Sequence, residues 1–182
     1  DLFLTITIKK TKMTRFEFLQ NKLVSIEEAK RRIISWKLKG EKICFTNGCF
    51  DILHLGHVNY LAASADYGNR LIVAVNSDVS VRRLNKADNR PINSEEARML
   101  LIAALGFVDL VLVFNEETPL DLIKDLQPDV LIKGADYDAS EHDSSNIKYI
   151  VGSKEVRSYG GAVCTVDFVQ GYSTTLILKK GN

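Results

Sequence analysis

The sequence predicts an α/β fold, a Rossmann-like doubly wound parallel sheet of about five strands with helices on both faces. Short apolar runs alternate with longer segments of helical periodicity, which is typical of strands joined by helical crossovers. The run RLIVAVN at 70–76 is apolar without interruption, which indicates a strand that is buried on both faces of the sheet.

Five short apolar runs are predicted to be the strands: 42–46, 70–76, 109–114, 129–134 and 162–168. In an open parallel sheet, ligands bind beyond the carboxyl ends of the strands. The segment 46–57 follows the first strand directly, so it lies where a site is expected. The polar stretch 136–149 is rich in Asp and Ser, and we expect it to be a mobile surface loop.

Five helices are predicted around these strands: 25–40, 57–68, 93–106, 118–126 and 173–180. Ser25 and Glu28 match the capping-box pattern at the start of the first helix. Thr118 is expected to cap the fourth helix, with Pro119 as its first helical residue. Ser173 is expected to cap the last one.

Length and composition indicate an ordinary globular chain. The 182 residues fit one main domain, expected over 23–182 after an N-terminal extension, partly disordered, over 1–22. Hydrophobic residues make up 46% and charged residues 26%, and the net charge of +1 gives no reason to expect a nucleic acid or a membrane as partner.

The three cysteines and the apolar runs bear on the compartment. The cysteines form no CxxC pair and no disulfide framework, so we expect a reducing cytoplasm. No apolar run approaches the roughly 18 residues of a membrane span. The apolar start of the chain has no preceding basic residues and no small-residue cleavage site, so we expect no signal peptide.

Two of the three histidines, His54 and His57, stand three residues apart in the segment that follows the first strand. His57 is expected to begin the next helix, where the helix dipole favours an anion. Gly56 has no side chain to block the space between the two imidazoles. Such a pair suits the stabilisation of charge that develops on a phosphorus centre.

Asn47 and Gly48 are expected to form a glycine-permitted turn whose backbone can approach a phosphate. A zinc site with Cys49 or Asp51 is an alternative, but no further His or Cys cluster completes a tetrahedron. Core or capping roles for the two histidines are another. Neither a G-x-G-x-x-G fingerprint after the strand nor a P-loop motif occurs, so phosphate chemistry of another kind is favoured.

NGCFDILHLGH resembles the G-x-F-D-x-x-H-x-G-H signature of the cytidylyltransferase-like nucleotidyltransferases. GYSTT at 171–175 resembles their second signature, a Ser-Thr-Thr turn that opens the last helix. The blocks AVNSD, RPINSEEAR, VDLVLVFNEETPLDLI and LIKGADY resemble one branch, the D-glycero-β-D-manno-heptose 1-phosphate adenylyltransferase domain of ADP-heptose synthesis. The resemblance extends over 24–179, nearly the whole chain.

This resemblance implies that ATP and a sugar 1-phosphate give an ADP-sugar and pyrophosphate by direct in-line attack, without a covalent intermediate. Mg²⁺ would arrive with the triphosphate. Members are commonly oligomeric, so we expect a homo-oligomer, a dimer. The alternatives are a cytidylyltransferase for glycerol 3-phosphate or a similar small phosphorylated alcohol, and a regulatory module that binds a nucleotide without turnover. The absence of an arginine in DFVQGYSTT disfavours the cytidylyl reading.

The residues that the resemblance assigns to catalysis are His54, His57, Lys86, Ser173 and Thr174. Lys86 matches a lysine that a mobile loop brings over the triphosphate, with Arg83 as a rival and a solvated lysine as the alternative. Ser173 could equally be an ordinary helix cap.

The residues expected at the nucleotide are Thr46, Asn47, Gly48, Cys49, Phe50, Asp51, Gly56, Arg98, Lys133, Gly134, Asp136 and Thr175. Several have ordinary alternatives. Thr46 could simply end the strand, and Asp51 could stabilise a turn. Arg98 could form a surface ion pair with Glu95, and the KGADY segment could be a strand-end turn.

Overall fold

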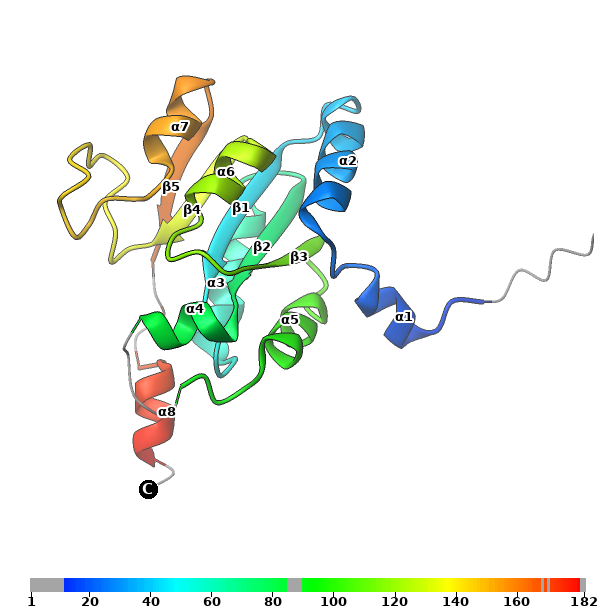
Figure 1. Ribbon diagram of the computed structural model, residues 1–182, viewed down its shortest axis with the longest axis vertical. Coiled ribbons are helices and arrows are strands. Elements are labelled where there is room, and N and C mark those ends of the chain that lie inside the picture. The colour runs from blue at the N-terminus through cyan, green and yellow to red at the C-terminus, as the bar shows by residue number, and fades with distance from the viewer. Residues whose placement is uncertain (1–11, 85–89, 168, 170, 181–182) are drawn as a thin grey trace, which may run out of the picture.

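The computed structural model describes residues 12–84, 90–167, 169 and 171–180. Its centre is a five-stranded, all-parallel sheet in the order β3-β2-β1-β4-β5, which confirms the predicted doubly wound α/β fold (Figure 1). The strands are β1 (Ile43–Gly48), β2 (Arg70–Asn76), β3 (Leu110–Phe114), β4 (Val130–Gly134) and β5 (Ala162–Val166). Each overlaps a predicted strand.

The described helices are α1 (Arg15–Gln20), α2 (Ile26–Lys37), α3 (Leu55–Ala65), α4 (Asp78–Arg83), α5 (Glu95–Ala103), α6 (Leu120–Leu126), α7 (Ser153–Ser158) and α8 (Thr174–Lys180). The sequence did not predict α1, α4 and α7. Each has 6 residues, too few for a helical period to stand out in the sequence.

The sheet separates two hydrophobic cores, because successive side chains of a strand point to opposite faces. Phe45 and Ile72 pack with α2, α6 and α7 on one face. Cys44 and Val73 pack with α3 and α5 on the other (Figure 1). Both faces of β2 are therefore buried, which is why its sequence is apolar without a break.

The cap of α2 forms only in part as predicted. Ser25 accepts a hydrogen bond from the backbone N–H of Glu28. The carboxylate of Glu28, however, accepts hydrogen bonds from Arg31 and Arg32 instead of completing the capping box. Charge-assisted bonds to two guanidinium groups are stronger than the backbone bond that the box would supply.

The predicted cap of α6 is wrong, whereas that of α8 is confirmed. Pro119 is the N-cap of α6 and no side chain caps this helix, so Thr118 stands one residue too early to do so. In α8, the hydroxyl of Ser173 accepts a hydrogen bond from the N–H of Leu176 at 3.2 Å.

The segment just before α2 is fastened to the sheet. Val24 donates to the carbonyl of Val111 at 3.1 Å, and the N–H of Val111 donates to the carbonyl of Lys22 at 2.8 Å. Helix α1 precedes this contact and has a complete capping box. Over the described ranges, no helix combines the length and the apolar character needed to cross a bilayer.

The strand order locates the crevice of the fold. The chain runs outward from β1 through β2 to β3, then returns to the opposite side of β1 for β4 and β5. The carboxyl ends of β1 and β4 therefore flank the point where the winding direction reverses. Open parallel sheets bind their ligands at such a point.

Two glycines with the same backbone conformation predict different costs of substitution. Gly152 and Gly160 both have φ of 87°, but a Cβ on Gly152 would lie 2.6 Å from the Cδ1 of the buried Ile123, whereas one on Gly160 would meet nothing within 4 Å. Gly160→Ala should lower the free energy of unfolding by about 1–2 kcal/mol through its conformation alone. Gly152→Ala should lower it by roughly 1–3 kcal/mol more through overpacking.

Urea unfolding of the two variants measures this difference directly. Equal losses in both variants would contradict the packing argument, since only the surroundings of the two glycines differ.

Candidate active site

A cavity of about 820 Å³ opens at the carboxyl ends of β1, β2 and β4. It brings together most of the residues that the sequence singled out. Those that line it are Asn47, Gly48, Cys49, Phe50, His54, Gly56, His57, Lys133, Gly134, Asp136, Ser173 and Thr174. They come from three stretches that lie far apart in the chain, 47–57, 133–136 and 173–174, so the fold itself assembles the site.

The turn after β1 differs from the prediction. Strand β1 continues through Gly48, so the expected turn at Asn47 and Gly48 is wrong. The chain turns instead at Phe50, whose φ of 49° lies in the left-handed region. A Cβ on Gly48 would lie 3.1 Å from the ring of Phe50, so the glycine leaves room for that ring to fold back over the end of the strand.

Phe50 is held in this conformation by burial. Its side chain is only 5% exposed and belongs to the core on the α3 side of the sheet. A non-glycine residue in the left-handed region costs of order 1–3 kcal/mol, and surrounding contacts must offset that cost. A sequence pattern alone does not reveal such a turn at a phenylalanine.

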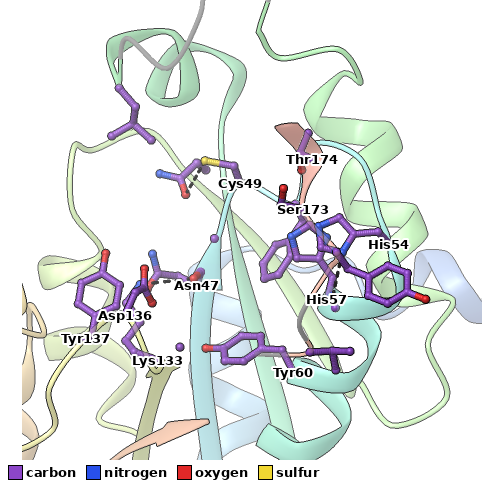
Figure 2. A pocket seen from close by; sticks show the side chains of 18 of the residues that line it. Asn47, Cys49, His54, His57, Tyr60, Lys133, Asp136, Tyr137, Ser173 and Thr174 are labelled. Carbon is purple, nitrogen blue, oxygen red and sulfur yellow. Dashed lines mark hydrogen bonds between the residues drawn. The ribbon is translucent and has the colours of Figure 1, made fainter. Parts of the chain in front are cut away.

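The histidine pair sits at the start of α3, which begins two residues earlier than predicted. The helix begins at Leu55, with His54 as its N-cap and His57 as its third residue. The Nδ1 of His54 accepts a long hydrogen bond of 3.4 Å from the N–H of His57, so His54 is a capping residue as well as a cavity residue (Figure 2).

The two imidazoles stack on each other. Their ring centroids lie 3.7 Å apart with an interplanar angle of 20°. The ring of Phe50 meets His57 edge-on, with its centroid at 5.2 Å. A Cβ on Gly56 would lie 3.0 Å from the ring of His54, so a larger residue there would push on the stacked pair.

Burial controls the charge of this pair. Burial and, to a smaller extent, the neighbouring His54 lower the pKa of His57 to about 4, although a hydrogen bond to the backbone of Ile52 acts in the opposite direction. Burial also lowers the pKa of His54. Both rings are therefore neutral near pH 7, and each can still donate one N–H to an anion.

A lysine faces the histidines across the end of β1. Lys133 donates to the side-chain oxygen of Asn47 at 2.8 Å, and its Nζ lies 5.1 Å from the ring centroid of Tyr137. Figure 2 shows Lys133, Asp136 and Tyr137 on one side of the cavity, and the two histidines with Ser173 and Thr174 on the other. The cavity therefore has two chemically distinct ends.

Three predicted residues lie behind the cavity wall rather than in it. Thr46 is buried, and its hydroxyl forms a 2.6 Å hydrogen bond with that of Tyr60. Asp51 is buried too, and one of its carboxylate oxygens accepts the N–H groups of Ile92 and Asn93. Through this oxygen Asp51 holds the backbone at Ile92 and Asn93, whereas its other carboxylate oxygen is buried without a hydrogen-bond partner among the described residues, 3.9 Å from the guanidinium of Arg90.

Arg98 is the third of these residues. It is fully buried, and its guanidinium forms an ion pair with Asp78 at 2.7 Å. Arg98 does not line the cavity, and its ion-pair partner is Asp78 rather than the Glu95 of the alternative interpretation. Helix α5 turns Arg98 toward the sheet, where protein acceptors surround it.

The remaining predicted residues are less fully described. Lys86 lies outside the described residues, and nothing about the side chain of Thr175 is described. Arg83, the rival of Lys86, donates weakly to the carbonyl of Asn115 and does not line the cavity. Ser173 caps α8, and its hydroxyl hydrogen remains available as a donor.

Several lining residues were not predicted: Tyr60, Asn76, Glu117, Tyr137 and Tyr172. The spacing could have indicated Tyr60, which lies three residues after His57 and therefore on the same face of α3. No such signal marks Glu117, because it lies on an irregular segment that only the fold brings to the cavity.

The lowered pKa of His57 predicts how its titration and the stability of the protein depend on pH. Its imidazole resonance should titrate with a midpoint near 4 rather than 6.5. The unfolded chain binds this proton at higher pH than the folded chain does, so stability should be lost as the pH falls from 6.5 toward 4. Inorganic triphosphate should raise the midpoint, because an anion stabilises the imidazolium.

Proton NMR with and without triphosphate tests this, and the resonance that disappears in His57→Ala identifies the group. An ordinary midpoint near 6.5 in the free protein would contradict the proposed effect of burial.

Comparisons with known proteins identify the family of this chain. A family model described as cytidylyltransferase-like matches residues 45–180. The bifunctional protein HldE of Gluconobacter oxydans is 47% identical over 97% of this chain and 36% of its own length. The HldE of Campylobacter concisus is 51% identical over 88% of this chain and 31% of its own. This chain thus spans about a third of the length of these curated relatives.

Solved structures agree on the fold. A lipopolysaccharide core biosynthesis protein from Thermoplasma volcanium matches 74% of this chain over its entire length, with a TM-score of 0.55 and 30% identity. A pantoate–β-alanine ligase from Francisella tularensis matches 80% of this chain with a TM-score of 0.55 but 14% identity, which supports the fold alone. Since the family model covers most of the chain, including both histidines and the Ser-Thr-Thr turn, the protein belongs to the cytidylyltransferase-like family.

Proposed function

We propose that this protein transfers AMP from ATP to D-glycero-β-D-manno-heptose 1-phosphate, giving ADP-heptose and pyrophosphate. The observation that carries the proposal is one cavity with two ends, in which stacked neutral imidazoles and hydroxyl groups face a lysine. The sequence blocks between the two signatures, and the identity to HldE proteins, support the heptose branch. Residues 23–182 would form the nucleotidyltransferase domain.

The proposed reaction is a direct displacement at the α-phosphorus of ATP. An oxygen of the sugar phosphate forms the new P–O bond while the bond to the β-phosphate breaks, and pyrophosphate leaves with the electron pair. The nucleophile is already anionic, so no general base is required. Positioning and stabilisation of charge then account for the rate.

The histidines suit the role of neutral donors in this step. Because the Nδ1 of His54 accepts a hydrogen bond, its proton resides on Nε2 and can be donated to a phosphate oxygen. A neutral donor binds an anion that gains charge without first having to lose a proton. The hydroxyl groups of Ser173 and Thr174 lie at the same end of the cavity and would donate alongside.

Mg²⁺ fits this site as a companion of the triphosphate. Within the described part of the chain, no group of three or more His, Cys, Asp or Glu side chains is arranged to hold a metal ion. Phosphate oxygens and water would supply most of its ligands, and Asp136 and Glu117 are carboxylates that line the cavity. Bound in this way, the ion would neutralise charge on the triphosphate.

The proposal extends to the setting of the enzyme. We infer a cytoplasmic homodimer without a nucleic-acid or membrane partner, on the basis of its composition and its family. ATP and a sugar 1-phosphate would then be its only substrates.

Release of pyrophosphate with Mg²⁺ tests the reaction when ATP and CTP are crossed against heptose 1-phosphate and glycerol 3-phosphate. We expect release only with ATP and heptose 1-phosphate, because the blocks around the cavity match that branch. Release with CTP and glycerol 3-phosphate would instead assign the protein to the cytidylyltransferase branch. Binding of ATP without release from any pair would favour a regulatory module.

Replacing His57 by Ala should lower turnover on the order of a hundredfold, the cost of removing one donor to the transition state. His142→Ala is the matched control, because that histidine is exposed on the 136–149 loop and does not line the cavity. Unchanged turnover in His57→Ala, with the fold intact by circular dichroism, would exclude the proposed role.

A further inference from the structure

Arg98 does not line the cavity, but it connects three segments around it. Its guanidinium donates to the carbonyl of Cys49 at 2.6 Å, to that of Asn93 at 3.0 Å, and to the carboxylate of Asp78 at 2.7 Å. The side chain is fully buried. A buried charge with this many acceptors is expensive to disrupt, because each acceptor would be left without a partner.

These contacts form a closed circuit with Asp51. The side chain of Asn93 donates to the carbonyl of Asp51 at 2.6 Å, and the N–H of Asn93 donates to the carboxylate of Asp51 at 3.1 Å. Arg98 in turn holds both Asn93 and Cys49. This network of hydrogen bonds therefore fixes the backbone on either side of one residue, Phe50.

Phe50 is the residue in the left-handed conformation, and its ring lies edge-on against His57. His57 stacks on His54. A continuous set of contacts thus leads from the guanidinium of Arg98 through the backbone at Cys49 to the imidazole pair. Relaxation of the turn at Phe50 would withdraw the ring that supports His57.

We propose that Arg98 is a positioning residue, which holds the backbone on both sides of Phe50 and thereby fixes the orientation of the His54–His57 pair. An arginine suits this role because its planar fork reaches several acceptors in fixed directions. A lysine at the same position is a single point donor, so it could keep the ion pair with Asp78 but not the bonds to both carbonyls.

The test uses Arg98→Lys and Arg98→Met, with Arg70→Met as the matched control. Arg70 is also paired with carboxylates, those of Glu41 and Asp109, but lies at the amino end of β2, away from the cavity. Imidazole proton resonances are the readout, since the chain has three histidines and His142 serves as an internal reference. This readout needs no substrate.

In both Arg98 variants we expect the resonances of His54 and His57 to shift while that of His142 stays in place. In Arg70→Met all three should stay in place. Where the proposed transfer reaction holds, kcat should fall on the order of tenfold to a hundredfold with a much smaller change in KM for ATP, because misplaced donors affect the transition state most. This expectation for kcat and KM rests on the proposed function.

Wild-type histidine resonances in a folded Arg98→Lys would overturn the proposal, since charge pairing with Asp78 would then suffice. Should Arg98→Met fail to fold, Arg98→Lys decides alone, because it retains the charge. An absence of activity in the unmodified protein would count against the proposed reaction, but it would leave the resonance result and the positioning role intact.

Discussion

The site depends on the turn after β1, which the backbone adopts at a cost in conformational free energy. Strand β1 ends at the centre of the sheet, and the backbone must then reverse within a few residues to begin α3. The reversal occurs at Phe50, which lacks the conformational freedom of glycine. Gly48 makes space for its ring, and a buried arginine holds the backbone beside it. The orientation of the imidazoles follows from this local conformation.

The sequence predicted the architecture and much of the site because strands, long helices and the histidine motif leave recognisable patterns in it. The parallel sheet was evident from unbroken apolar runs, and the histidine pair from its position after the first strand. Helices of 6 residues left no such signal. The contacts of Arg98 could not be predicted either, since two of its three acceptors are backbone carbonyl groups. Backbone acceptors have no sequence signature.

The electrostatics of the cavity explain why a buried imidazole pair and a lysine can coexist in it. Two protonated rings at 3.7 Å would repel strongly, so burial and proximity together favour the neutral state. Charge in the cavity then comes from Lys133, from the carboxylates of Asp136 and Glu117, and from any ligand that enters. An anion would meet polar donors that need little reorganisation, which is the condition under which such donors contribute most to catalysis.

The pairing of Lys22 and Val24 with Val111 has a consequence for the solubility of the sheet. An exposed edge strand presents unpaired N–H and C=O groups that can template pairing with another chain. Here the segment ahead of α2 occupies the N–H and C=O groups of Val111, the second residue of β3, with a parallel bridge between Leu23 and Val111. The short segment thus covers this part of the exposed edge, which hinders growth of the sheet into aggregates from that side.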